Sequence, residues 1–272
     1  MPWAIMIRKI GGSLAAAICN VSEYKSRWDA YRILVENWKA ERNLQMAVGE
    51  ALEPLCASEY RAQRPGWDVY GAQEIERGEW ARAHLDGFAV KTGEQRRVVE
   101  YKTASVRTMD KWASGRIPTD YLMQVQFYMW ASGTDVADIG VLFGNERFEI
   151  REVLADHELQ ERMVSECDRF WREHVVPKIP PPIDGSGACA IWLREKYPGP
   201  EAGEKEPLRE PTDEERQLVA AYRASKDASE QHGKAMSAIR NQLKSVIGTS
   251  RGISGVAMQN KNGVIRIFGE EK

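Results

Sequence analysis

A change of hydrophobic period near residue 66 decides the fold class that this sequence predicts. Upstream, residues 28–39 and 43–60 repeat apolar side chains at helical spacing, after a short helix expected to start at Ser13. Downstream, "WDVYGAQEIERG", "WARAHLDGFAVKTG" and "QRRVVEYKT" alternate apolar and polar residues, as the strands of an antiparallel meander do. An α/β fold follows, because both kinds of element occur within one continuous stretch.

The elements after the meander complete a predicted core. A helix opens at Pro118 and ends at Gly133, and two more strands are predicted in "ADIGVLFGN" and "ERFEIREVL". A long helix over residues 156–176 follows. We therefore expect a central mixed β-sheet flanked by helices, within a core domain over residues 1–177.

The last third of the chain has a different composition. Residues 178–211 are rich in proline, glycine and charge, which predicts a linker or an extended wrapping segment. Thr212 then caps a helix that Gly233 is expected to break in two, with Glu215 completing a capping box. The chain ends in a predicted hairpin with its turn at residues 260–263, so residues 212–272 form a helical and hairpin accessory region.

Composition excludes several classes of protein. The 272 residues are 43% hydrophobic and 29% charged, as in soluble globular proteins, and no apolar run approaches the ~18 residues of a membrane span. The first residues lack the pattern of a signal peptide, so we expect a cytoplasmic protein with no membrane partner. No cysteines form a C-x-x-C pair, so small buried side chains are expected instead of a metal site at Cys19, Cys56, Cys167 and Cys189.

Basic residues concentrate between positions 91 and 116. Seven lysines and arginines stand there against three acidic residues, although the whole chain has a net charge of −2. A local basic surface of this kind suits nucleic-acid phosphates. The alternative is an ordinary solvated loop, and the pattern by itself favours the loop.

One strand carries a carboxylate and an amine on the same face. Side chains alternate along a strand, so Glu100 and Lys102 in "VVEYKT" point the same way. If the preceding strand pairs with this one as a hairpin, Asp86 in "HLDGF" lies beside them. Carboxylate oxygens suit Mg²⁺ or Mn²⁺, and a lysine can orient an attacking water. The alternative is a cross-strand salt bridge on a wet sheet face.

Two helices carry further polar candidates. "GEALEP" places Glu53 on a helix just before the sheet, as a third carboxylate or as an exposed helical glutamate. In "YLMQVQFYMW", Gln124 and Tyr128 share one helix face and Gln126 lies roughly opposite. A buried glutamine needs hydrogen-bond partners, which the lysine and a water would supply.

These motifs together resemble a known family. "GEALEP", "HLDGF", "VVEYKT" and "YLMQVQFYMWASG", in this order, are similar to the YqaJ-type viral recombinases of the PD-(D/E)XK nuclease superfamily, over about residues 8–176. The resemblance implies a restriction-endonuclease-like core. It also implies a site with two Mg²⁺ or Mn²⁺ ions, with Asp86, Glu100 and the backbone carbonyl of Tyr101 as metal ligands.

The resemblance assigns roles to the remaining candidates. Glu53 would complete a second metal site or hold a metal-bound water, Lys102 would position the nucleophilic water, and Gln124 would orient Lys102 or that water. Ser13, with Arg8 upstream, matches a serine that receives the terminal 5′ phosphate in the family. His84 is expected either to contact phosphate or simply to pack.

The resemblance also implies an activity. Similar proteins degrade the 5′-ended strand of linear duplex DNA and leave a 3′ single-stranded tail for an annealing protein. The resemblance further implies a homo-oligomer, a trimeric ring as in one member of the family, in the cytoplasm of a bacterial host and encoded by phage or prophage. Two alternatives stay open: an endonuclease of the same superfamily, and a DNA-binding recombination scaffold without catalysis.

Overall fold

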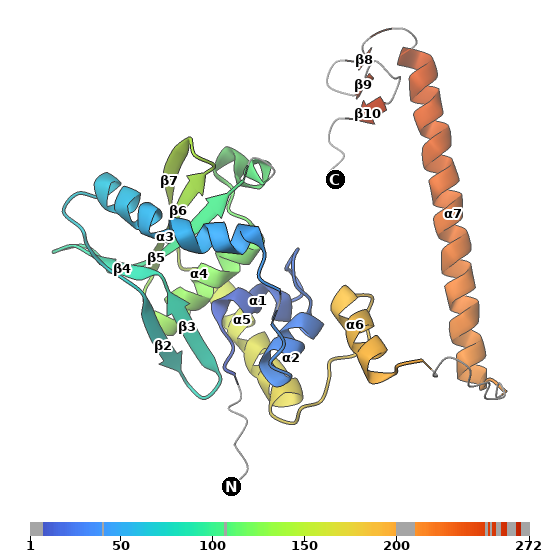
Figure 1. The fold of residues 1–272 in the computed structure, drawn as a ribbon, viewed down its shortest axis with the longest axis horizontal. Helices are drawn as coiled ribbons and strands as arrows, with labels where there is room; N and C mark the ends of the chain where they lie inside the picture. The colour runs from blue at the N-terminus through green and yellow to red at the C-terminus, as the bar shows by residue number, and fades with distance from the viewer. Residues whose placement is uncertain are drawn as a thin grey trace. The chain divides into compact units, whose positions relative to one another are not determined.

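The structure is a computed structural model of the chain, which separates into two compact units, Met1–Gly199 and Pro200–Lys272 (Figure 1). The residues that it describes are 8–39, 41–105, 108–199, 210–247, 250, 252–253, 257–259 and 265–267. Each unit is treated by itself below.

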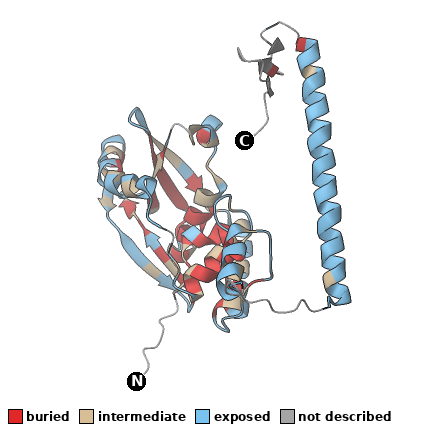
Figure 2. Ribbon diagram, turned by 45° about the vertical axis from the view of Figure 1, so that its right-hand side comes forward, coloured by how far each residue is buried: buried red, intermediate tan, exposed pale blue. Residues whose placement is uncertain are grey.

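A five-stranded mixed sheet forms the centre of the first unit. Its strand order is β1-β4-β5-β6-β7, with β5 and β6 parallel and the other neighbours antiparallel. The strands are β1 (Asp68–Tyr70), β4 (Gly87–Val90), β5 (Arg97–Ala104), β6 (Val136–Phe143) and β7 (Arg147–Leu154). Strand β6 is buried along its whole length, as a central strand should be (Figure 2). The predicted mixed sheet is therefore confirmed.

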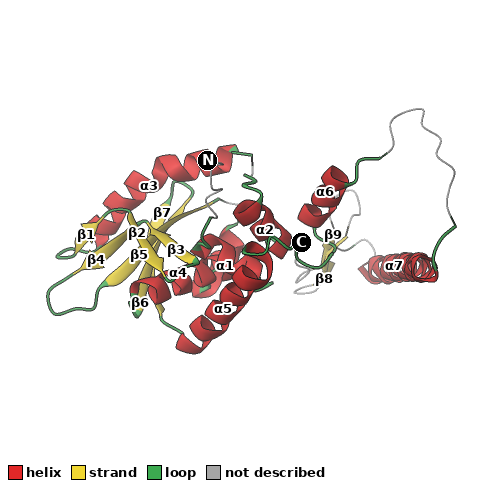
Figure 3. Cartoon of the chain, turned by 90° about the horizontal axis from the view of Figure 1, so that it is seen from below, coloured by secondary structure: helices red, strands yellow, loops and turns green. Residues whose placement is uncertain are grey.

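Helices cover both faces of this sheet (Figure 3). Helix α3 (Leu44–Gln63) packs Cys56 and Tyr60 against Val99 and Tyr101, which share one face of β5. The opposite face packs into a larger core that the remaining helices enclose. These helices are α1 (Gly12–Ile18), α2 (Arg27–Val35), α4 (Thr119–Ser132) and α5 (His157–Phe170), which continues as the π-helical turn η2 (Trp171–Val175), with the short 3-10 segment η1 (Met109–Gly115) before α4.

Two of the predicted strands are each divided in two. "WDVYGAQEIERG" forms β1 and β2 (Gln73–Arg77), and "WARAHLDGFAVKTG" forms β3 (Ala81–Leu85) and β4. Strands β2 and β3 pair in a separate two-stranded sheet. The prediction of unbroken strands is wrong because the chain leaves one sheet and enters the other at Asp86. At the next residue, a Cβ on Gly87 would lie 2.4 Å from the carbonyl oxygen of Tyr70, so only glycine fits there.

Local helix signals agree with the structure in most places. Helix α4 ends where Gly133 takes the left-handed conformation, with φ of 64°. Helix α1 begins at Gly12, one residue earlier than predicted, and Gly11 caps it without a side-chain hydrogen bond. Three of the cysteines are buried, and Cys19 is half-buried, in agreement with their predicted packing role.

The segment expected to be a linker or a wrapping segment contains a helix. Helix α6 (Gly187–Lys196) begins after the N-cap Ser186 and packs Cys189 and Trp192 against Trp28 of α2. The Trp28 indole N–H also donates to the carbonyl oxygen of Pro182 at 2.9 Å. The apolar side of α6 is short, and its packing partner Trp28 lies far upstream in the sequence. Composition alone therefore did not predict this helix.

The described basic residues between positions 91 and 116 lie on β5 and on the segments before and after it. Strand β5 separates the two ends of this stretch by its own length, about 25 Å at the usual rise per residue. Within the strand, Arg97 bonds to the buried Asp138, and Lys102 bonds to Glu100. Two of these residues are thus paired with carboxylates, and the basic surface suggested by the sequence stays a prediction.

The second unit consists of a long helix and a small sheet. Helix α7 (Asp213–Ile247) is continuous through Gly233, so the predicted break is wrong, whereas the Thr212–Glu215 capping box is confirmed. Strands β8 (Gly252–Ile253), β9 (Ala257–Gln259) and β10 (Ile265–Ile267) form an antiparallel sheet. The predicted turn at 260–263 lies outside the described residues. No helix in the described ranges is long and apolar enough to span a membrane.

Candidate active site

Glu100 is the centre of a polar cluster on the α4 side of β5. It is 2% exposed, and its Oε1 accepts hydrogen bonds from Lys102 Nζ and from Gln124 Nε2, the latter at 2.8 Å. Its Oε2 is buried without a hydrogen-bond partner among the described residues. A buried carboxylate oxygen left unpaired is costly, so this atom is poised to accept a further ligand.

Asp86 lies directly beside this carboxylate. Strands β4 and β5 pair Gly87 with Val99, and the same register carried one step further sets Asp86 opposite Glu100. Its Oδ2 accepts the backbone N–H of Tyr101 at 2.7 Å, which fixes the half-buried carboxyl group at the bend between β3 and β4. The structure thus brings together the pair that the "HLDGF" and "VVEYKT" motifs predict.

Burial and the opposite charge of the partner act in opposite directions on the pKa values of Glu100 and Lys102. Burial raises the pKa of Glu100 to about 7, with Asp86 adding to the rise and Lys102 opposing it. For Lys102, burial acts to lower the pKa, but the neighbouring Glu100 carboxylate outweighs it, so the pKa is raised overall. The lysine is therefore an ammonium ion at neutral pH, and it acts as a hydrogen-bond donor.

Glu53 approaches the cluster from α3. It lines a cavity of about 420 Å³ together with Tyr101 and Lys102. Burial, and after it the nearby Asp86 carboxylate, raise the pKa of Glu53. Glu53 is exposed on its helix, as one of the two sequence interpretations expected, but it lines the same cavity as Lys102.

Helix α4 supplies the amide that the sequence predicts. Gln124 Nε2 bonds to Tyr128 OH at 2.7 Å as well as to Glu100, so both residues share the site face. Gln126 lies on the other side, where it bonds to Leu154 and to Gln160. The prediction that Gln124 and Gln126 lie on opposite faces of α4 is confirmed.

The donor set fits a divalent cation. Asp86 and the unpartnered Glu100 oxygen are hard oxygen donors in adjacent strands, of the type that Mg²⁺ and Mn²⁺ take. No group of three acidic, histidine or cysteine side chains closes around one point within the described residues. A site with two protein carboxylates leaves coordination positions for water and for substrate oxygens, which is how Mg²⁺ is usually held.

The predicted phosphate-binding residues lie on β3 and around the start of α1, where Gly12 packs against Gln124 and Tyr128 of α4. Ser13 is exposed in the first turn of α1, and Arg8 is half-buried ahead of that helix. His84 is exposed on β3, with Nδ1 3.3 Å from Glu74 Oε2, so the expectation that it simply packs is wrong. The contacts of these three residues leave their predicted roles as predictions.

Two features of the site escape the sequence reasoning. The Tyr121 ring lies 5.1 Å from Lys102 Nζ, and its spacing to Gln124 and Tyr128 on one helix face was a usable signal. The second feature is Asp138, which is fully buried in β6 and accepts the Tyr60 hydroxyl at 2.7 Å. This bond fastens α3 to the sheet and so sets the position of Glu53.

Comparison with known proteins supports the motif-based resemblance. Residues 5–135 match the family model of the YqaJ-like viral recombinase domain. The YqaJ protein of Bacillus subtilis (strain 168) is 28% identical over 203 residues, which cover 72% of this chain and 62% of the relative. The chain thus spans about three fifths of that relative's length. The resemblance predicted from the four motifs is confirmed for the matched region.

Solved structures share the fold. An alkaline exonuclease from Laribacter hongkongensis, LHK-Exo, aligns with a TM-score of 0.54 at 20% identity, covering 70% of this chain and 93% of the exonuclease. Its complex with dAMP aligns equally well, at 19% identity. The predicted α/β core with a central mixed sheet between helices is confirmed, and its fold is shared with the alkaline exonuclease.

Proposed function

We propose that this chain is a divalent-metal-dependent DNA exonuclease. The observation that carries the proposal is the Glu100 carboxylate: one oxygen is held by Lys102 and Gln124, and the other is buried without a partner beside Asp86. The match to the YqaJ-like viral recombinase domain and the alkaline exonuclease fold support the same conclusion. The substrate is the 5′-ended strand of linear duplex DNA, and the product is a 3′ single-stranded tail.

Each residue has a distinct task in this proposal. Asp86, Glu100 and the Tyr101 carbonyl would hold Mg²⁺ or Mn²⁺, and Glu53 would contribute to a second ion or to its water. A bound divalent ion polarises the phosphoryl group and lowers the pKa of a coordinated water. Lys102, as an ammonium ion, donates to the attacking water or to a phosphate oxygen.

The surrounding contacts keep these groups in place. The Tyr101 backbone N–H holds Asp86, and Gln124 holds the Glu100 oxygen that faces Lys102. The Tyr128 hydroxyl oxygen accepts a hydrogen bond from Gln124 Nε2 and limits the rotation of that amide group. Preorganised groups of this kind contribute to catalysis because they do not reorient during the reaction.

Digestion of linear duplex DNA labelled at either end tests the activity and its polarity. We expect Mg²⁺-dependent loss of the 5′-ended strand, abolished in Asp86→Ala and Lys102→Ala proteins that still fold by circular dichroism. Lys91→Ala, which changes an exposed lysine directly after β4, is the matched control and keeps full activity. Full activity in either site variant would refute the assignment of the site.

A 5′ phosphate on the labelled strand tests the role proposed for Ser13 and Arg8. We expect wild-type protein to prefer a 5′ phosphate over a 5′ hydroxyl, and Ser13→Ala to lose that preference while it retains cleavage. An unchanged preference in the variant would remove Ser13 from phosphate recognition.

Two alternative functions make different predictions. An endonuclease of the same superfamily would cut closed circular duplex, whereas an exonuclease needs an end. A scaffold without catalysis would not bind Mn²⁺ in a calorimetric titration. Both measurements use the wild-type protein and separate the three functions.

The match to the YqaJ-like viral recombinase domain supports a proposal for the biological setting. We infer a role in annealing-based recombination with a single-strand annealing protein as partner, in the cytoplasm of a bacterial host and encoded by phage or prophage. A homo-oligomer, a trimeric ring by resemblance, is part of this proposal. Sedimentation of the purified protein with and without duplex ends tests the assembly.

A further inference from the structure

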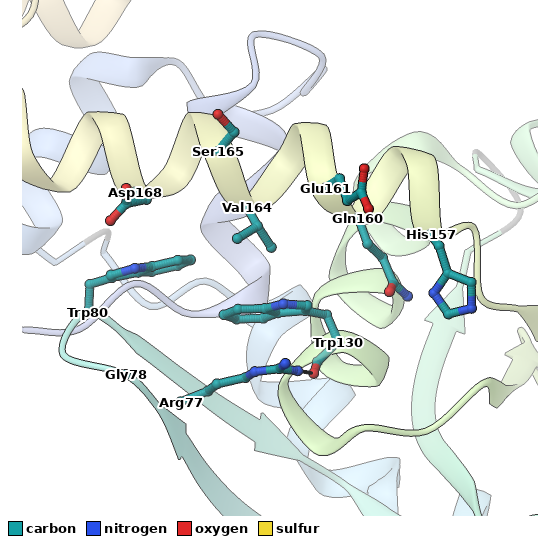
Figure 4. A pocket seen from close by; sticks show the side chains of 10 residues that line it. All are labelled: Arg77, Gly78, Trp80, Trp130, His157, Gln160, Glu161, Val164, Ser165 and Asp168. Atoms are coloured by element: carbon teal, nitrogen blue, oxygen red, sulfur yellow. Dashed lines mark hydrogen bonds between the residues drawn. The ribbon is translucent and has the colours of Figure 1, made fainter.

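A second pocket lies away from the candidate active site, at the other end of α4. It is formed by the β2–β3 turn, by Trp130 in the last turn of α4, and by the exposed side of α5 (Figure 4). Its volume is about 580 Å³, enough for one or two amino-acid side chains, and none of its lining residues belongs to the Glu100 cluster.

Two tryptophans make the floor of this pocket. The indole rings of Trp80 and Trp130 are nearly parallel, at 12°, with centroids 5.4 Å apart. Arg77 stacks on Trp130 at 4.6 Å and donates to the Trp130 carbonyl oxygen. In Figure 4, Arg77 lies on one side of the Trp130 ring, while Val164 of α5 lies on the other side. The ring therefore binds one guanidinium already, and Val164 and the space of the pocket lie on its second face.

Acidic side chains of α5 stand around this aromatic floor. Glu161 and Asp168 are seven residues apart and so project from the same side of the helix, into the pocket lining. Asp168 is paired with Arg172 one turn further on, but Glu161 makes no ion pair with any residue in the described part of the chain. Figure 4 shows Asp168 directed toward the Trp80 ring and Glu161 above the Trp130 side.

An indole floor with carboxylates above it is the chemistry that recognises an organic cation. A lysine or arginine head over a tryptophan face gains a cation–π interaction, of about 0.5–2 kcal/mol, and a neighbouring carboxylate adds an ion pair. The carboxylates of Glu161 and Asp168 disfavour a nucleic-acid phosphate in the same space, although Arg77 and His157 also line it. Val164 and the indole edges, in turn, favour an apolar neighbour beside the cation.

We propose that this pocket docks a segment of a partner protein that presents a basic side chain next to an apolar one. The basic head lies over the Trp80 and Trp130 rings and pairs with either Glu161 or Asp168. The apolar side chain packs against Val164. This site is separate from the proposed nuclease reaction and does not require that the chain cleaves DNA.

A display library of random dodecapeptides selected against the full chain tests the proposal. We expect enriched peptides to share an arginine or lysine adjacent to a Leu, Ile, Phe or Trp. Their affinity, measured by calorimetry, falls by about tenfold or more, ~1.4 kcal/mol, in the double variant Glu161→Gln/Asp168→Asn. Both changes are nearly isosteric and lie on a helix surface, so the fold is retained.

Glu158→Gln is the matched control, because Glu158 is exposed on the same helix, pairs with Arg162 and lies outside the pocket. It should bind the peptides as wild type does. Three results would overturn the proposal: enriched peptides without basic residues, equal affinity for the double variant, or competition by single-stranded DNA. A change in the sedimentation mass of the double variant without peptide would instead identify a second copy of the chain as the occupant, and it would also overturn the proposal.

Discussion

Replacing Gln124 with leucine removes one donor from the buried Glu100 carboxylate. The Gln124 side chain is 9% exposed, and its Nε2 lies 2.8 Å from Glu100 Oε1. A hydrogen bond to a charged group contributes about 1.5–3 kcal/mol. Leucine fills a similar volume, so the main loss is this bond and the one to Tyr128.

The lost bond favours the ionised form of Glu100, so its removal raises the pKa of Glu100 further. Burial already brings that pKa to about 7, and ~1.4 kcal/mol corresponds to one pKa unit, so the expected rise is about one to two units. Below its pKa Glu100 is protonated and does not bind metal. Mn²⁺ affinity and DNA cleavage should therefore fall near neutral pH in the variant and recover about one to two pH units higher.

Calorimetric Mn²⁺ titrations over a pH series, with cleavage rates at each pH, measure this displacement. Gln126→Leu is the matched control, since it removes the same group from the same helix on the opposite face. It should lower stability without moving the pH profile. An unshifted profile in Gln124→Leu, or an equal shift in both variants, would refute the reasoning.

Three further predictions concern stability. Tyr60→Phe removes the 2.7 Å bond to buried Asp138 and should lower the free energy of unfolding in urea by about 1.5–3 kcal/mol, whereas Tyr70→Phe, on an exposed ring, should not. Gly87→Ala places a Cβ 2.4 Å from the Tyr70 carbonyl oxygen, so thermal unfolding should show a loss of about 1–3 kcal/mol, accompanied by slower cleavage. Gly233→Ala, with open space around its Cβ, should stabilise α7 by ~1 kcal/mol in a melt followed by circular dichroism; a lower melting temperature would contradict it.

Features set by neighbouring residues were predictable from the sequence. The shared face of Glu100 and Lys102 follows from strand alternation, and that of Gln124 and Tyr128 follows from helical spacing. The end of α4 at Gly133 follows from its left-handed conformation. Local backbone geometry determines each of these features, so they could be predicted from a single sequence.

Features that depend on distant partners were not predictable in the same way. The division of the predicted strand "WARAHLDGFAVKTG" at Asp86 depends on the close approach of Gly87 to Tyr70, a contact between strands. Helix α6 depends on the aromatic face of Trp28, far upstream in the chain. The pocket between α5 and the β2–β3 turn needs three separate elements, none of which carries a motif for it.

The pairing of Asp86 with Glu100 makes the connection between β4 and β5 tolerant of insertions and deletions, whereas strand β5 itself is not. Asp86 meets Glu100 through backbone pairing of β4 with β5, so residues may be gained or lost in the connection over 91–96 as long as that pairing is kept. A slip of one residue along β5 would instead turn Glu100 and Lys102 toward α3 and bring Tyr101 to face α4. Divergent descendants of this chain should therefore vary freely in the length of that connection. Asp86 should stay directly before Gly87, and the spacing from Val99 to Lys102 should stay constant.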